Sequence, residues 1–245
     1  MAWDIQNLKD DVEHLYGKAQ MELLSESLES IIDRKDYASY HFKESAKLLR
    51  EVLADKSDGI SLVKLILGFD EQDSHDFFLS KNKAKANIIA CLQSMHAVAD
   101  ILSHAIYYSL NMNNNPSDKM EPRLVDIHTV LAKMSKHEEY KALCKYVKCL
   151  IGHANYKYMG VIVNRSKHRS IVGMPYKLDI QKSFDDWSHG IEFHAFEHDC
   201  KLYTERWVDD YLKTEFARQD QLLLEIGNEL NRVVRDKKAS VRMGG

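Results

Sequence analysis

Hydrophobic residues recur at helical spacing along most of this chain. The clearest case lies between residues 82 and 110, where the apolar positions are separated by 4, 3, 4, 3 and 4 residues: Ile88, Leu92, Met95, Ala99, Leu102 and Ile106. This spacing predicts a long helix with one apolar seam that packs against other helices. A polar run with Pro116, over residues 111–118, is expected to end it.

Similar but weaker periodicities predict further helices over residues 4–33, 37–53, 123–134, 138–167 and 201–235. Two stretches are ambiguous. The short apolar run 60–69 suits either a helix or a buried strand. Gly152 and Gly160 weaken the segment 138–167 as a helix, but no turn signal lies between His153 and Asn164, so we favour helix to about residue 167.

The pattern changes after Ser170. Residues 171–175 and 191–197 are short, extended-looking runs, and the second alternates apolar and polar positions. We therefore predict a mainly α protein, a bundle of five to seven helices with a small two-stranded β-ribbon near residues 170–197. Residues 1–235 are expected to form a single helical domain, with 1–80 as an alternative N-terminal helical subdomain. The basic, glycine-ended tail 236–245 is expected to be flexible.

The amino-acid composition excludes several classes of fold and function. Only 3 prolines and 10 glycines occur in 245 residues, which argues against a turn-rich β fold. The net charge of −3 excludes a global electrostatic attraction for nucleic acid, so any such contact must be local. Four cysteines without a CxxC pair are typical of a reducing compartment. No apolar run of 18 residues or secretory signal is evident, so we expect a cytoplasmic protein without a membrane partner.

A cluster of polar residues directly follows the apolar run Val161–Val163 and is the first candidate site. We assign catalytic roles to His168, Arg165 and Asn164, and substrate binding to Arg169 and Lys167. A histidine can act as acid or base near neutral pH, and the neighbouring cations could hold a phosphate. The alternative is a polar helix end whose cations complement the helix dipole.

A second candidate is the polar stripe His96, Asp100 and His104, which steps by four residues beside the apolar seam. If it faces inward, Asp100 or His104 could meet His168 and contribute to substrate binding. The stripe could instead bind a metal, or form a hydrogen-bonded layer that specifies packing.

A third group, His189, His194, His198 and Cys200, is dense in metal-ligand residue types. Its spacing matches no structural zinc pattern, so we interpret it as a solvated ribbon edge. Phosphate-binding loops, nucleophile elbows and HExxH pairs are missing from the sequence, and we expect neither a metal nor a cofactor.

The stretch VNRSKHRSIV, after an apolar helix, resembles members of the HEPN-like helical superfamily over about residues 82–235. That resemblance implies a helical bundle from a bacterial toxin–antitoxin or phage-defence system that acts on or senses RNA or nucleotide. Asn164, Arg165 and His168 fall at the family's polar signature. Active members are metal-independent ribonucleases, usually dimeric, whose Arg and His lie four to six residues apart. Arg165 and His168 are three apart.

Two other functions remain open from the sequence. One is a non-catalytic helical module that binds a protein partner, such as a defence-system subunit. The other is a metal-dependent helical hydrolase that uses His96, Asp100 and His104.

Overall fold

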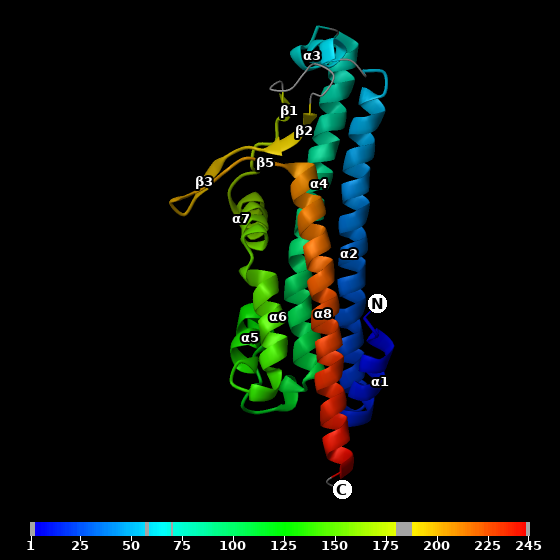
Figure 1. The fold of residues 1–245 in the computed structure, drawn as a ribbon, viewed down its shortest axis with the longest axis vertical. Coiled ribbons are helices and arrows are strands. Elements are labelled where there is room, and N and C mark those ends of the chain that lie inside the picture. Colours follow the sequence, from blue (N-terminus) through cyan, green and yellow to red (C-terminus); the bar gives the residue numbers. More distant parts are fainter. Residues whose placement is uncertain (1–2, 57–58, 70, 180–187, 244–245) are drawn as a thin grey trace. The chain divides into compact units, whose positions relative to one another are not determined.

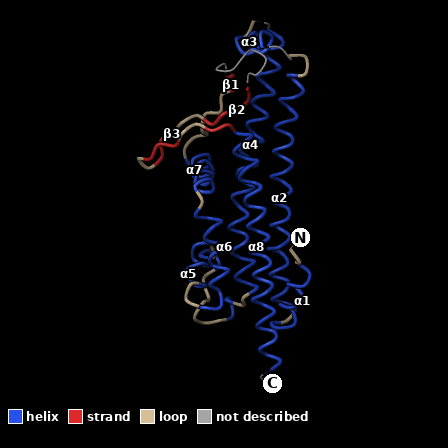
Figure 2. The backbone as a smooth tube through the Cα atoms, viewed as in Figure 1, coloured by secondary structure: helices blue, strands red, loops and turns tan. Residues whose placement is uncertain are grey.

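The computed structural model describes residues 3–56, 59–69, 71–179 and 188–243 (Figure 1). Helix dominates these residues, and the strands are few and short (Figure 2). The predicted class, mainly α with a small β part, is confirmed. The described part holds eight α-helices: α1 (Ile5–Tyr16), α2 (Lys18–Leu53), α3 (Gly59–Leu67), α4 (Glu71–Ser109), α5 (Ile127–Met134), α6 (Lys141–Gly152), α7 (Ala154–His168) and α8 (Val208–Met243).

The chain divides into two compact units that alternate along the sequence. The first unit comprises Met1–Lys35, Met95–Lys157 and Phe216–Gly245, and the second comprises Asp36–Ser94 and Tyr158–Glu215. Helices α2, α4, α7 and α8 contribute residues to both units. The alternative boundary near residue 80 coincides with neither unit's limits, because the two long helices α2 and α4 carry the chain from one unit into the other.

The core of the first unit contains buried apolar residues of α1, α2, α4, α5, α6 and α8. All six seam positions predicted along α4 are buried, although Ile88 and Leu92 belong to the second unit. The 3₁₀ turn Met112–Asn114 lies within the polar run that ends α4. A second, Pro122–Leu124, follows that run, and a third, Glu138–Tyr140, precedes α6. The predicted helix 4–33 is interrupted at Gly17, whose φ of +86° ends α1.

Both ends of the chain pack against each other within the first unit. The Trp3 indole donates to Asn231 Oδ1 at 3.0 Å, and the Asn231 amide donates to the Asp4 carbonyl at 2.7 Å. Seven residues further along α8, Lys238 pairs with the buried Asp11 at 2.5 Å. The tail that we expected to be flexible from residue 236 is part of α8 as far as Met243, and Lys238 joins this part of the helix to α1.

The second unit contains the strands. Strand β2 (Ser188–Phe193) pairs antiparallel with β1 (Tyr176–Asp179) on one side and with β5 (Arg206–Trp207) on the other. Strands β3 (Phe196–His198) and β4 (Lys201–Tyr203) form a separate hairpin. Residues 60–67 of the ambiguous run 60–69 belong to α3, so this run is helical rather than a strand.

Several predicted boundaries differ from the structure. Helix α4 begins at Glu71 rather than near residue 82, and α2 continues through residues 34–36, where the prediction had a break. The closing helix begins at Val208 rather than near residue 201, because residues 201–207 pair as β4 and β5. The segment 138–167 is two helices, since His153 is extended and its Nδ1 accepts from the Asn155 amide at 3.2 Å. The first ribbon strand lies at 176–179, after the predicted 171–175.

One described helix, α4, is long and apolar enough to cross a bilayer. However, 56% of its most apolar window is buried inside the protein. That burial is typical of the core helix of a soluble protein.

Candidate functional site

Helix α7 positions the first candidate site. Within the second unit its residues Tyr158, Met159, Ile162 and Val163 are buried, which fixes the helix in the core up to one residue before the polar cluster. The backbone amides of Arg169 and Ser170 both donate to the Arg165 carbonyl at 2.9 Å and close the helix end. The cluster at residues 164–169 therefore begins on a rigid element.

Two side chains of residues 164–169 are engaged. The Ser166 hydroxyl donates to the Val163 carbonyl at 2.8 Å within α7, and Arg165 reaches another element. Its Nη1 donates to the Glu197 carbonyl at 2.9 Å, and its guanidinium lies over the Phe196 ring at 5.6 Å. Both partners belong to β3. Arg165 thus ties the end of α7 to the β3–β4 hairpin.

The other four residues of the cluster, Asn164, Lys167, His168 and Arg169, are exposed. None of the four side chains makes a hydrogen bond or ion pair within the described part of the chain. No hydrogen bond joins Asn164 to His168, so the amide does not orient the imidazole in this conformation. The structure therefore presents an open polar surface, with two cations that lack an ion-pair partner among the described residues, rather than a preorganised acid–base pair.

Aromatic rings pack around Tyr158, one turn and a half before the cluster on α7. Tyr158 contacts Phe193 and Tyr211, and Arg206 lies 4.4 Å from the centre of the Tyr158 ring. Burial raises the pKa of Tyr158 to about 12, which Arg206 partly opposes. Tyr158 is therefore protonated near neutral pH and acts as a packing residue.

The β3–β4 hairpin adds a stacked aromatic pair beside the cluster. The rings of Phe196 and Tyr203 are nearly parallel, 5.1 Å apart, and Lys201 Nζ lies 5.1 Å from the Tyr203 ring centre. The hairpin turns through Asp199 and Cys200, both with positive φ. In Figure 1, β3 extends outward beyond the end of α7.

The stripe His96, Asp100 and His104 lies in the first unit, whereas His168 lies in the second. The His96 ring stacks on Tyr156 at 5.5 Å, and Asp100 is exposed. Burial lowers the pKa of His104, and the Asp100 carboxylate opposes that shift. Their assigned contribution to substrate binding stays a prediction.

The histidines of the third group are dispersed. His189 contacts the Tyr176 hydroxyl at 2.5 Å, while His194 is exposed and the His198 ring approaches Asp199 at 3.4 Å. Throughout the described ranges, no three His, Cys, Asp or Glu side chains are grouped so that they could hold a metal ion.

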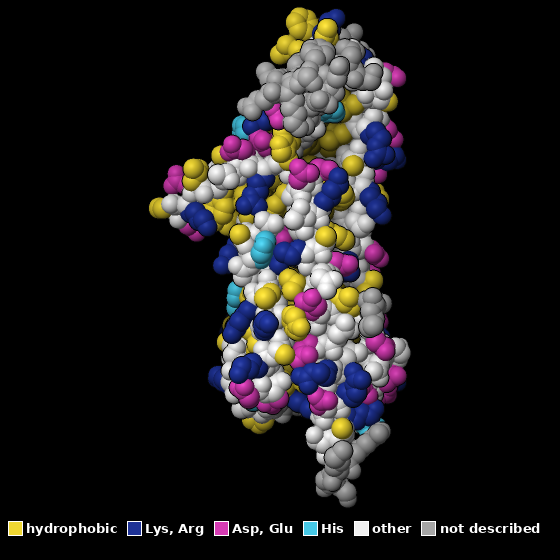
Figure 3. Space-filling model, in the orientation of Figure 1, with side chains coloured by type: hydrophobic (Ala, Val, Ile, Leu, Met, Phe, Trp, Pro, Cys, Tyr) yellow, Lys and Arg dark blue, Asp and Glu magenta, His cyan; other side chains and the backbone are white. Residues whose placement is uncertain are grey.

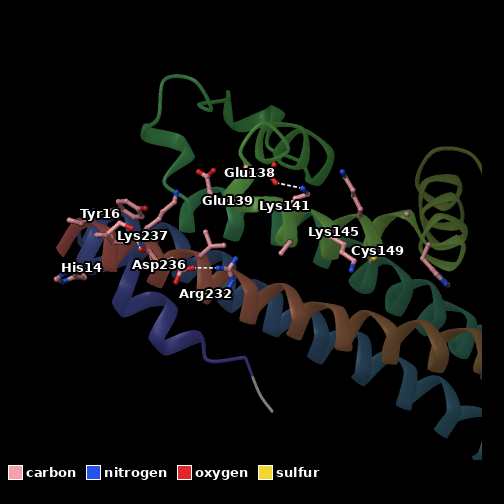
Figure 4. Close-up of a pocket in the computed structure, with 18 residues that line it drawn as sticks. His14, Tyr16, Glu138, Glu139, Lys141, Lys145, Cys149, Arg232, Asp236 and Lys237 are labelled. Carbon is pink, nitrogen blue, oxygen red and sulfur yellow. Dashed lines mark hydrogen bonds and ion pairs between the residues drawn. The ribbon is translucent and has the colours of Figure 1, made fainter. Parts of the chain in front are cut away.

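A groove in the first unit was missed by reasoning from the sequence. It has a volume of about 1610 Å³ and lies between α6, the C-terminal part of α8 and the end of α1 (Figure 4). At one end, Lys237 donates to the Tyr140 hydroxyl and lies over the same ring at 4.8 Å. Burial lowers the pKa of Lys237, while Glu139 and Asp118 oppose the shift.

The sequence carries only part of the signal for this groove. Lys141, Lys145 and Lys148 share one face of α6 at helical spacing, which can be read from the chain. Nothing in the sequence indicates that the end of α1 and residues 232–241 of α8 face the same helix.

Comparison with models of protein families, with curated proteins and with solved structures found no match to this chain.

Proposed function

We propose that this protein is a HEPN-like cytoplasmic protein of a bacterial defence or toxin–antitoxin setting that binds single-stranded RNA, without metal or cofactor. One observation carries the proposal. Asn164, Lys167, His168 and Arg169 are exposed together at the end of α7, without side-chain partners among the described residues. The resemblance of VNRSKHRSIV to the HEPN-like superfamily supports RNA as the ligand.

The chemistry of the cluster suits a nucleic-acid strand. Lys167 and Arg169 offer two cations for adjacent phosphates, and Asn164 and His168 offer hydrogen-bonding groups on the same surface. Arg165 is held by the Glu197 carbonyl and Phe196, so it stabilises the surface rather than reaching for the ligand. The net charge of −3 keeps the attraction local to this surface.

Binding fits this geometry better than cleavage. A general base needs its ring oriented by a fixed partner, and His168 has none within the described residues. Arg165, the arginine of the family signature, is occupied by the hairpin. The proposal is therefore RNA sensing by a surface, with ribonuclease activity as the outcome that would contradict it.

Fluorescence anisotropy with a labelled single-stranded RNA tests the proposal at several salt concentrations. The double variant Lys167→Ala/Arg169→Ala is expected to weaken binding about tenfold. It should also reduce the slope of log K against log salt by about 1.4, since each single-strand phosphate contact contributes about 0.7. Unlabelled duplex DNA is added as a competitor, to measure whether the protein prefers single-stranded RNA.

The matched control is Arg50→Ala/Lys83→Ala, which removes one exposed arginine and one exposed lysine from the same unit. This control should leave both affinity and salt slope unchanged. Equal losses in the two double variants would show that RNA contacts the protein unspecifically. If the protein cleaved the RNA in the presence of excess chelator, and if His168→Ala abolished this cleavage, the binding proposal would be replaced by a catalytic one.

A further inference from the structure

The groove of the first unit is too large for an ordinary small ligand. Its volume of about 1610 Å³ exceeds the roughly 300–1,000 Å³ of typical small-molecule pockets. Its two long walls are helices. Lys141, Lys145 and Lys148 lie along α6, and Val233 and Lys237 lie along α8. A groove bounded by two helices has the form that accepts a third helix.

The floor of the groove offers apolar surface for such a helix. Leu15 and Tyr16 come from the end of α1, Ala142 from α6, and Val233 and Val241 from α8. These residues are brought together from three separate parts of the chain, which the packing of α1 and α8 holds in place. An apolar face of a bound segment would be covered here.

The charges around the groove leave an excess of cations. Lys141 pairs with Glu138 at 2.8 Å, and Arg232 pairs with Asp236 at 2.6 Å. Lys145 and Lys148, both exposed and less than one helical turn apart, have no ion pair within the described part of the chain. Figure 3 shows Lys and Arg side chains gathered over α6.

We propose that this groove binds an acidic amphipathic helix of a partner protein. The apolar face of that helix would cover the groove floor. Acidic residues three or four positions apart along its edge would pair with Lys145 and Lys148. This inference goes beyond the proposed RNA binding and rests on different residues in the other unit. The positive charges of Lys145 and Lys148 favour an acidic partner. The apolar floor of the groove favours a peptide rather than a nucleic-acid strand.

Two exposed cysteines provide a site-resolved measurement. Cys149 lines the groove, while Cys200 lies in the hairpin turn of the second unit and serves as an internal reference. Cys91 and Cys144 are buried, and burial raises the pKa of both thiols, so both react slowly at neutral pH. Alkylation of each cysteine can be followed by mass spectrometry.

The probe is a synthetic 18-residue helix with a leucine stripe and glutamates on both flanks. A second peptide carries lysine at every glutamate position. The glutamate peptide is expected to slow alkylation of Cys149 at least fivefold without changing that of Cys200. The lysine peptide should protect neither cysteine.

Charge reversal tests which residues recognise the peptide. Lys145→Glu/Lys148→Glu should weaken binding of the glutamate peptide at least tenfold and create measurable binding of the lysine peptide. The matched control Lys119→Glu/Lys136→Glu reverses two exposed lysines of the same unit outside the groove, and should bind as the wild type does. Circular dichroism verifies that both variants stay folded.

Several results would overturn the proposal. These are equal protection of Cys149 by both peptides, unchanged affinity after charge reversal in the groove, or no protection by the glutamate peptide at all. Protection of Cys149 by single-stranded RNA or by oleate, at concentrations where the glutamate peptide has no effect, would assign the groove to another ligand class.

Discussion

Arg165 and His168 lie less than one helical turn apart but differ in their surroundings. Arg165 donates to the Glu197 carbonyl and covers Phe196, whereas His168 is exposed without a side-chain partner among the described residues. Arg165→Ala should therefore lower the free energy of unfolding by about 1–2 kcal/mol. Arg165→Lys should restore only part of the lost free energy of unfolding, because the lysine ammonium lacks the planar, forked donor geometry of the guanidinium.

His168→Ala is the matched control in the same urea titration. Its free energy of unfolding should stay within about 0.5 kcal/mol of the wild type, as for other exposed sites. A large loss of stability in His168→Ala, with Arg165→Ala unchanged, would reverse the roles that the structure gives these two residues.

The pH dependence of stability includes a contribution from His104. Burial lowers the pKa of His104 in the folded protein below its ordinary value of 6.5. The unfolded chain then binds the proton more strongly, so stability falls as the pH drops below 6.5 toward the lowered value. Replacing His104 with Asn should flatten the curve of unfolding free energy against pH between 7.5 and 5.5. An unchanged curve would contradict this assignment.

At the level of elements, the contact between the N-terminal segment and α8 depends on a glycine. A Cβ atom on Gly227 would lie 2.2 Å from the Trp3 ring, so Trp3 packs directly on the helix backbone. Alanine in place of glycine ordinarily stabilises a helix by about 1 kcal/mol. Here the steric clash with Trp3 should outweigh the gain in helix propensity. Gly227→Ala should therefore destabilise the protein by about 1–2 kcal/mol in thermal or urea unfolding.

Gly152→Ala is the control for this substitution, since nothing lies within 4 Å of the Cβ it would add. It should be neutral or stabilising. If Gly227→Ala proved as stable as Gly152→Ala, the N-terminal segment would not be packed on α8 in solution.

The elements that the sequence predicted well are those with a strong period. The seam of α4 follows from its spacing alone, and all six positions are buried. Residues 201–207 were misassigned because Tyr203, Trp207 and Tyr211 are spaced like a helix, while pairing with β2 and β3 overrides that local pattern. Beyond residue 235, where the prediction ended, Lys237 and Lys238 of α8 contact Tyr140 and Asp11.

For the whole molecule, the sequence indicated the polar cluster at 164–169 but not its surroundings. The engagement of Arg165 depends on the Glu197 carbonyl, 32 residues away in the hairpin. The groove depends on the convergence of three segments from both ends and the middle of the first unit. Contacts between residues so far apart in the sequence produce no local periodic pattern from which they could be predicted.

The two proposed sites share no residue and belong to different units, which leads to a prediction for the whole protein. Lys145→Glu/Lys148→Glu should leave the affinity for single-stranded RNA within twofold of the wild type. Lys167→Ala/Arg169→Ala should likewise leave the rate of Cys149 protection by the glutamate peptide unchanged. In the protein that combines both pairs of substitutions, each assay should show only the effect of the pair at its own site, because independent sites contribute additively to free energy. Anisotropy and alkylation on the same four proteins measure this. A groove variant that lost RNA affinity tenfold would instead mean that one extended basic surface serves both ligands.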